Sequence, residues 1–249
     1  RILVTRARAQ ASKLTTGLEE LGAECFEAPA IKIVPPDDKG KALDEAIGHL
    51  ADYDWAIFTS VNGVEYFFRS LQQAGLDTRS LGGISICAIG SSTAEALQSY
   101  GIMADVVPAD YTAEGVLAAL YGKLKSGDKV LLPRAAEARN VLPEELSQQG
   151  IDVTVVPAYK TEAGDADKYL VTKMLSDGEL DMVTFTSSST VKNIVKLLGD
   201  QAVDLLKNVK IAAIGPITAE TCRQQGLQVD VQAEEYTIAG LIKAIKEAF

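Results

Sequence analysis

Four short loops rich in glycine and hydroxyl residues are the first candidates for chemistry. Their sequences are TSVNG, IGSST, TSSST and IGPIT, beginning at residues 59, 89, 186 and 214, and each follows an apolar run and precedes a helical pattern. Loops of this kind collect at the carboxyl edge of a parallel sheet, where ligands bind. Helix N-termini there offer unpaired N–H groups and a partial positive charge. Any one loop can be a simple helix cap, but four matched loops facing one cleft favour a multiply anionic ligand.

A single tyrosine is the second candidate. Tyr159 lies in the sequence PAYKT, is followed by Lys160, and aligns with Ile31 in the other copy of an internal repeat. A phenol has an ordinary pKa of about 10, so it stays protonated near neutral pH and can donate a hydrogen bond or a proton. The alternative is a tyrosine that only packs on an extended linker.

Other common catalytic sites lack their residues. The one histidine, His49, falls in the helical stretch ALDEAIGHL, so neither a Ser-His-Asp triad nor a histidine metal site is predicted. No nicotinamide or P-loop nucleotide motif occurs. A flavin is harder to exclude because TSSST is hydroxyl-rich, although Trp55 is the only tryptophan. Cys25, Cys87 and Cys222 are odd in number and widely spaced, which predicts small buried side chains in a reducing cytosol.

The most informative feature of the sequence is an internal duplication. Three blocks recur in order: RILVTRARAQ with KVLLPRAAEA, WAIFTSVNGV with MVTFTSSSTV, and ISICAIGSSTAEAL with VKIAAIGPITAETC. The aligned pairs include Arg6 with Arg134, Thr59 with Thr186, and Thr93 with Thr218.

Each block is typical of a strand followed by a helix. Runs such as WAIF are continuously apolar, which indicates strands buried on both faces of a parallel sheet. Residues 64–71 follow with helical spacing of apolar side chains. Ser92 and Glu95 have the spacing of a capping box, and Pro216 suits a first helical turn. Alternating strands and helices predict an α/β chain with two doubly wound lobes.

Composition excludes several classes of protein. The chain has 249 residues, of which 47% are hydrophobic and 23% charged, as in an ordinary globular protein of one large or two small domains. Its net charge of −10 disfavours binding to nucleic acid or to a membrane surface. No apolar run approaches the roughly 20 residues that span a bilayer, and we expect no secretory leader before the first strand.

The ordered motifs resemble those of uroporphyrinogen-III synthase over nearly the whole chain. They are VTR, FTSVNGV, AIGSSTAEAL, PAYKT, FTSSSTV, AIGPITAETCRQQG and YTIAGL, and their order, spacing and duplication are more specific than any one of them. The resemblance implies two flavodoxin-like lobes with parallel sheets, joined by a two-stranded linker ladder. Residues 1–35 and 160–249 would form one discontinuous lobe, and residues 36–159 the inserted one. The first block of each copy would then pack with the second and third blocks of the other.

The resemblance also implies an activity. The substrate would be hydroxymethylbilane, a linear tetrapyrrole with eight carboxylates. Loss of its terminal hydroxyl gives an azafulvene, ring D attacks through its substituted carbon, and the spiro intermediate reopens and closes with ring D inverted, giving uroporphyrinogen III. The family further implies a cytoplasmic monomer with no cofactor and no metal, and is compatible with transient contact with the preceding pathway enzyme.

By the same resemblance, Tyr159 matches the acid for the leaving hydroxyl, and Thr218 matches a threonine near the substrate. Arg134 and Lys160 are expected carboxylate partners, and Thr93 can instead cap its own helix. Pro216 and Ile217 replace two serines of the first copy, so this loop is expected to bind less. The other expected contributors of hydroxyl or backbone donors are Thr59, Ser60, Asn62, Gly90, Ser91, Thr93, Thr186, Ser187, Ser188 and Gly215.

Three other interpretations stay open. A two-lobed protein that senses or carries a small anion without catalysis would use the same helix termini. A flavin-binding protein would be yellow when purified. A duplicated chain without any ligand is disfavoured by the matched hydroxyl loops.

Overall fold

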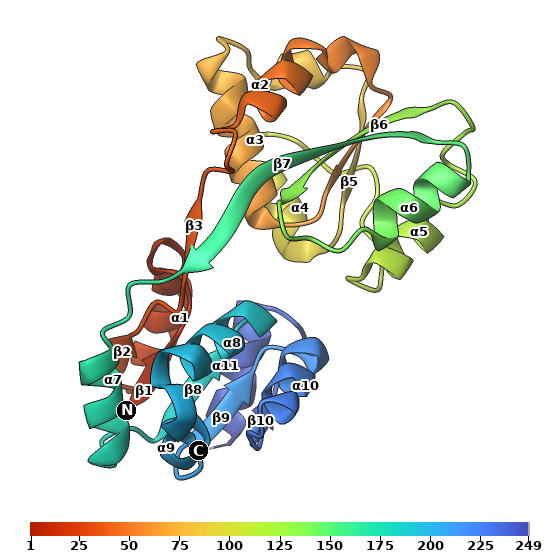
Figure 1. Cartoon of the computed structure of the whole chain (residues 1–249). Helices are drawn as coiled ribbons and strands as arrows, with labels where there is room; N and C mark the ends of the chain where they lie inside the picture. The colour runs from red at the N-terminus through yellow and green to blue at the C-terminus, as the bar shows by residue number, and fades with distance from the viewer. Residues whose placement is uncertain (249) are drawn as a thin grey trace. The chain divides into compact units, whose positions relative to one another are not determined.

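A parallel sheet organises each of the two compact units into which the chain divides (Figure 1). The computed structural model describes residues 1–248, except for the side chains of residues 8–10 and 12. Unit 1 consists of Arg1–Lys32 and Glu162–Phe249, and unit 2 of Ile33–Thr161. The chain therefore passes from one unit to the other twice.

The sheet of unit 1 has its strands in the order β10–β9–β8–β1–β2, and every neighbouring pair is parallel. The strands are β1 Ile2–Val4, β2 Cys25–Glu27, β8 Met182–Phe185, β9 Lys210–Ala213 and β10 Val231–Gln232.

The sheet of unit 2 has the order β3–β7–β6–β4–β5, with β7, β6, β4 and β5 parallel to their neighbours in that series. Its strands are β3 Ile31–Val34, β4 Trp55–Phe58, β5 Ser85–Ala88, β6 Lys129–Ala135 and β7 Asp152–Ala163.

Strand pairing crosses the two copies of the repeat. In unit 1, β1 of the first copy pairs with β8 of the second, with Leu3 opposite Val183. In unit 2, β6 of the second copy pairs with β4 of the first, with Val130 opposite Trp55. The prediction of an α/β chain with two parallel sheets is confirmed.

Helices cover both faces of each sheet, as the packing of their apolar side chains shows. In unit 1, α1 and α11 pack on one face and α7, α8, α9 and α10 on the other. In unit 2, α2, α3 and α4 pack on one face and α5 and α6 on the other. The bounds are α1 Arg8–Glu19, α2 Lys41–Gly48, α3 Val61–Gln73, α4 Ser91–Ser99, α5 Ala113–Leu120, α6 Val141–Gln148, α7 Lys168–Ser176, α8 Ser188–Leu198, α9 Ala202–Leu206, α10 Pro216–Gln224 and α11 Ile238–Glu247.

The central strands are buried on both faces. Along β4, Ala56 and Phe58 pack under α2, α3 and α4, whereas Trp55 and Ile57 pack under α5 and α6. Alternate side chains of a strand point to opposite faces, so a strand covered twice is apolar throughout. The continuous apolar runs in the sequence follow from this arrangement.

The first residues of four helices show how each helix begins. Pro216 occupies the first turn of α10, as predicted. Ser60 and Ser187 cap α3 and α8 through their hydroxyl groups. The capping box predicted at Ser92 is wrong. Helix α4 already begins at Ser91, its N-cap is Gly90, and no side chain caps it. The tight strand-to-helix turn starts the helix two residues earlier than the hydroxyl spacing indicated.

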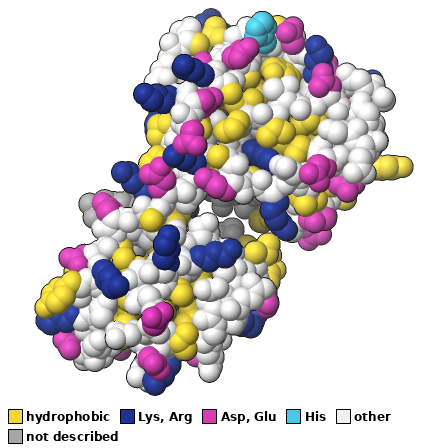
Figure 2. Space-filling view, in the orientation of Figure 1, with side chains coloured by type: hydrophobic (Ala, Val, Ile, Leu, Met, Phe, Trp, Pro, Cys, Tyr) yellow, Lys and Arg dark blue, Asp and Glu magenta, His cyan; other side chains and the backbone are white. Residues whose placement is uncertain are grey.

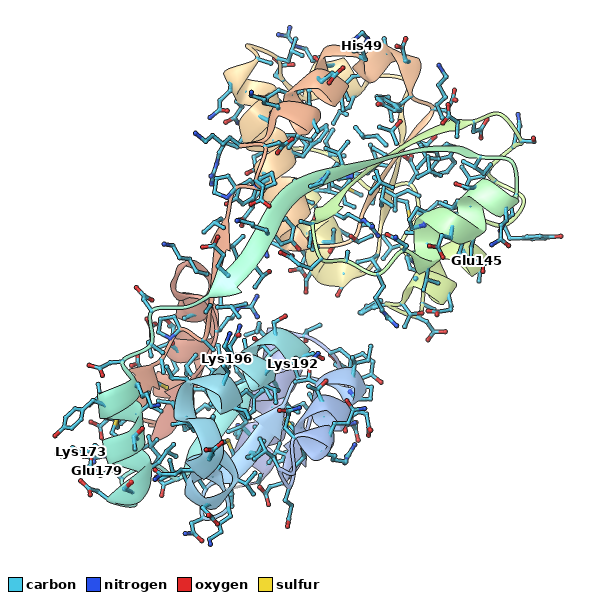
Figure 3. The ribbon with its side chains drawn as sticks, in the orientation of Figure 1. His49, Glu145, Lys173, Glu179, Lys192 and Lys196 are labelled. Carbon is cyan, nitrogen blue, oxygen red and sulfur yellow. The ribbon has the colours of Figure 1, made fainter. Side chains whose placement is uncertain are left out.

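His49 is exposed in unit 2 (Figures 2 and 3), and its Nδ1 lies 3.5 Å from an Asp52 carboxylate oxygen. Among the helices formed by residues 1–248, none combines the length and the apolar character needed to cross a membrane.

The core of unit 2 yields a stability prediction. Phe58 is fully buried and packs edge-on against Phe67, with ring centroids 5.2 Å apart. Replacing a buried phenylalanine by alanine leaves a cavity, so we expect Phe58→Ala to lower the free energy of unfolding by about 3–5 kcal/mol in urea denaturation. The control is Tyr121→Ala, because the Tyr121 side chain is 86% exposed, and we expect a change of at most about 0.5 kcal/mol. Equal effects of the two substitutions would contradict this account of the core.

Candidate active site

The Tyr159 phenol sits at the carboxyl edge of the sheet of unit 2. Tyr159 lies on β7 opposite Ala135, the last residue of β6. Its hydroxyl oxygen is 3.0 Å from Ser60 Oγ, which belongs to the loop after β4. Asn62, in the first turn of α3, also forms a side-chain hydrogen bond with the phenol. The structure therefore brings together three of the residues selected from the sequence, and all three lie within unit 2.

Burial dominates the acidity of this phenol. The Tyr159 side chain is only 7% exposed, and desolvation raises the pKa of Tyr159 above its ordinary value. The hydrogen bonds with Ser60 and Asn62 act in the opposite direction, because they stabilise the phenolate, and the Glu137 charge adds to the rise. The phenol is therefore protonated at neutral pH and has a preformed network that can accept its negative charge.

Tyr66 completes the surroundings of Tyr159 and was missed in the sequence. The two rings are stacked with their centroids 5.9 Å apart, and the Arg69 guanidinium lies 4.9 Å from the Tyr66 ring centroid. Burial raises the pKa of Tyr66 as well. Tyr66 follows Asn62 by four residues on α3, so the two lie on the same side of that helix. Selecting Asn62 could have led to Tyr66 by this spacing.

Ser60 has two structural roles at once. Its Oγ accepts a hydrogen bond from the backbone N–H of Gly63 at 3.0 Å and so caps α3, while it also contacts the phenol. The cap uses the N–H of the third helical residue, which leaves the N–H groups of Val61 and Asn62 as donors at this helix terminus. Thr59 lies half-buried between the end of β4 and this cap.

The second loop of unit 2 presents backbone more than side chain. Gly90 is buried, and a β-carbon there would come within 2.8–3.1 Å of the Tyr111 ring. Close approach of this ring therefore requires glycine. Ser91 is half-buried in the first turn of α4, and Thr93 is buried in the same helix. Thr93 does not cap α4, which has no side-chain cap.

In unit 1, three hydroxyl groups of the loop after β8, those of Ser187, Ser188 and Thr190, form hydrogen bonds within the protein. Ser187 caps α8 and forms a reciprocal capping box with Thr190. Ser188 Oγ lies 2.7 Å from Thr221 Oγ1, which ties the start of α8 to α10. Thr186 is half-buried between β8 and the cap. The first-turn N–H groups of α8 are further donors that this loop offers to a ligand.

The loop after β9 matches the second loop of unit 2. Gly215 is buried beneath the Tyr236 ring, where a β-carbon would lie 2.9 Å from the nearest ring carbon. Tyr111 and Tyr236 are half-exposed, at 40% and 50%, and they are aligned residues of the repeat that sequence reasoning did not select. Thr218 is 5% exposed in the first turn of α10. Pro216 has no N–H, so this terminus offers one donor fewer than α4.

Both predicted cationic residues have partners inside unit 2. The Arg134 side chain is buried, and its guanidinium donates to the Arg139 carbonyl at 2.6 Å and to Asn140 Oδ1. Lys160 Nζ donates to the Asp37 carboxylate at 2.6 Å. These bonds fix the loop after β6 and the segment after β3.

Two exposed lysines add positive charge to unit 1. Lys192 and Lys196 lie on α8 one turn apart (Figure 3), beyond the serine loop. The i, i+4 spacing in VKNIVKLL could have identified them. Figure 2 otherwise shows acidic and basic side chains interspersed on the visible face of each unit.

Thiol and metal chemistry have little support within residues 1–248. Cys87 and Cys222 are buried and Cys25 half-buried, and burial raises the pKa of these thiols to about 12, 11 and 11 respectively. Protonated thiols are weak nucleophiles. No group of three or more His, Cys, Asp or Glu side chains suited to a metal ion occurs in that part of the chain.

Known proteins share both the sequence and the fold. A family model described as uroporphyrinogen-III synthase HemD matches residues 12–243. A uroporphyrinogen-III synthase from Synechococcus elongatus is 35% identical, over 99% of this chain and 94% of its own. A putative uroporphyrinogen-III synthase from Methanothermobacter thermautotrophicus is also 35% identical, over 97% and 96%.

Two solved structures agree in fold. A mutant uroporphyrinogen III synthase from Thermus thermophilus superposes with a TM-score of 0.68 at 21% identity, over 100% of this chain and 98% of its own. The enzyme from Helicobacter pylori gives 0.63 at 17% identity, over 100% and 99%. The match of the family model over nearly the whole chain and the 35% identity of full-length relatives show that this chain belongs to the uroporphyrinogen-III synthase family.

Proposed function

We propose that this chain is a uroporphyrinogen-III synthase that converts hydroxymethylbilane into uroporphyrinogen III and uses no cofactor. The observation that carries the proposal is the buried Tyr159 phenol, 3.0 Å from Ser60 Oγ at the carboxyl edge of a parallel sheet. The reaction starts with the loss of a hydroxyl group, and this step needs a weak acid held in place.

The hydrogen bonds around Tyr159 suit that step. Ser60 Oγ already accepts from the Gly63 N–H, so its own proton is available for the phenol oxygen. With Ser60 as donor, the phenol proton points to the substrate. As that proton transfers to the leaving hydroxyl, Ser60 and Asn62 stabilise the phenolate that forms.

Tyr159 can both give the proton that the first step needs and take up the proton that the last step releases. The phenol protonates the hydroxyl group, which leaves as water, and the substrate becomes an azafulvene cation. Ring D attacks through its substituted carbon, and the spiro intermediate fragments and closes again with ring D inverted. The final ring gives up one proton as it becomes aromatic, and the Tyr159 phenolate can take it back. The net change is the loss of one water molecule.

Helix termini supply the binding energy for the carboxylates. The first-turn N–H groups of α3, α4 and α8 are donors that need no lysine, and each terminus carries a partial positive charge. This explains how a chain with a net charge of −10 can bind a substrate with eight negative charges. We propose further that the enzyme acts in the cytoplasm as a monomer; contact with the preceding pathway enzyme stays a prediction.

A coupled assay tests the function. Hydroxymethylbilane is generated enzymatically, this protein is added, and the oxidised products are separated by chromatography. We expect isomer III to replace isomer I with no added cofactor. Isomer I alone, from protein with the circular dichroism of a folded α/β chain, would reject the synthase proposal and favour an anion-binding protein.

The acid role of Tyr159 predicts a separation of kcat from KM. Tyr159→Phe keeps the ring and its stacking on Tyr66 but removes the proton donor, so we expect kcat to fall by about 10²–10⁴-fold with little change in KM. Tyr121→Phe is the matched control, because that side chain is 86% exposed, and it should retain full activity. Unchanged turnover of Tyr159→Phe would remove Tyr159 from the acid role.

Thr218 gives a second prediction. Its side chain is buried, yet its hydroxyl group takes part in no side-chain hydrogen bond that the structure records among residues 1–248. Valine has nearly the same volume, so Thr218→Val should fold normally with an unchanged Tm. We expect its kcat/KM to fall by roughly tenfold, the value of one hydrogen bond to a charged group. Full activity would show that the hydroxyl does not contact substrate.

The raised pKa of Tyr159 predicts a change of stability with pH. The folded protein holds this proton more tightly than the unfolded chain, whose phenol has a pKa of about 10. The stabilisation is complete below that pH and is lost as the pH rises through the folded pKa. Urea denaturation between pH 9 and about 11.5 should therefore show a steeper loss of stability in the wild type than in Tyr159→Phe. Parallel curves would mean that burial does not hold the proton on this residue.

A further inference from the structure

Arg6 lies at the carboxyl edge of the sheet of unit 1. It follows β1, and the residue before it is fixed, because Thr5 Oγ1 donates to the Thr184 carbonyl of β8 at 2.6 Å. Thr184 Oγ1 in turn donates to the Leu3 carbonyl at 3.2 Å. The register of β1 and β8, with Val4 opposite Thr184, places Arg6 at the same edge as the loop that begins at Thr186.

The guanidinium of Arg6 has a buried donor atom that the protein does not use. The residue is half-buried, and its Nε is buried with no hydrogen-bond partner, the one such side-chain nitrogen or oxygen among the described residues. No ion pair is recorded for it with the side chains that the structure describes. The chain has 34 acidic residues against 24 basic ones. The absence of an ion pair between Arg6 and the described side chains is therefore not due to a shortage of carboxylates.

A half-buried cation with an unused buried donor is unfavourable for the protein on its own. Desolvation of a charged group costs free energy unless hydrogen bonds or an opposite charge compensate it, and burial accordingly lowers the pKa of Arg6. The planar guanidinium presents parallel N–H donors that match the two oxygens of a carboxylate. A carboxylate ligand would therefore remove the penalty that the protein alone carries.

The other copy of the repeat shows what a structural arginine looks like at this position. Arg134 aligns with Arg6 and is buried, and it donates to the Arg139 carbonyl and to Asn140 Oδ1. The loop after β6 thus accepts hydrogen bonds from both terminal nitrogens of Arg134. The corresponding segment after β1 leaves the Nε of Arg6 unused.

We propose that Arg6 binds a carboxylate of the tetrapyrrole in unit 1, as a specificity-determining residue, while Arg134 has a structural role. This inference rests on the proposed function for the identity of the ligand. The donor itself requires only a carboxylate.

The test compares Arg6→Gln with Arg134→Gln in the full chain. The probe is uroporphyrin III, the oxidised form of the proposed product with eight carboxylates, and its binding is followed by fluorescence. We expect Arg6→Gln to raise both the Kd for the probe and the KM in the coupled assay by roughly tenfold or more, with an unchanged or higher Tm. Arg134→Gln should instead lower Tm, because it frees a buried network. Arg6→Lys should recover part of the binding through its charge.

Arg223→Gln controls for the loss of one positive charge from unit 1. Its side chain is 55% exposed and paired with Glu220, so we expect a Kd like that of the wild type. Wild-type Kd in Arg6→Gln would overturn the inference, as would a fall in Tm equal to that of Arg134→Gln. If the wild type makes only isomer I while probe binding still depends on Arg6, the carboxylate site stands and the synthase proposal fails. Loss of probe binding in Arg223→Gln to the same extent would show a general charge effect and reject a specific site.

Discussion

The arrangement of this protein depends on the burial of its central strands on both faces. A doubly covered strand such as β4 is apolar throughout, and a buried hydroxyl such as that of Thr184 in β8 is accommodated only by a bond to the backbone of the neighbouring strand. The polar side chains of the candidate site therefore gather at the carboxyl edge, where Ser60 meets Tyr159 in unit 2 and where Ser187 caps α8 in unit 1. Helix N-termini lie at the same edge, so each unit has backbone donors beside its hydroxyl groups.

The hydroxyl groups mostly position the site and leave the contact with anions to the backbone. Ser60, Ser187 and Ser188 each form a hydrogen bond within the protein, and these bonds fix the starts of α3 and α8. A terminus held in this way offers its remaining N–H groups without reorganisation, which is the condition for efficient electrostatic stabilisation. Because each terminus contributes only about 0.3–1 kcal/mol to the binding of one exposed anion, several of them are needed for a polyanion.

Patterns local in the sequence predicted the fold well. The continuous apolar runs and the proline at the start of α10 each depend on a few neighbouring residues. The site was harder to predict, because its bonds join residues far apart in the chain, such as Ser60 with Tyr159. The sequence also could not show that the Arg134 guanidinium forms hydrogen bonds within the protein, because its partners lie in an irregular loop. The capping box failed at Ser92 because a tight turn, set by the strand before it, overrode the hydroxyl spacing.

The duplication gives the chain two similar edges, but the reaction has one leaving group and needs one acid. The copies have therefore diverged where chemistry requires it: Tyr159 has a phenol where its partner Ile31 has none. A second acid at the other edge would protonate nothing and would cost the desolvation of a further hydroxyl. Arg6 and Arg134 have diverged in the same way. The Arg134 guanidinium donates to the carbonyl of its own loop, whereas Arg6 keeps an unused donor. A duplicated scaffold thus supplies paired anion sites by symmetry. The residues at which the two copies differ then determine where the acid acts and which site binds a ligand.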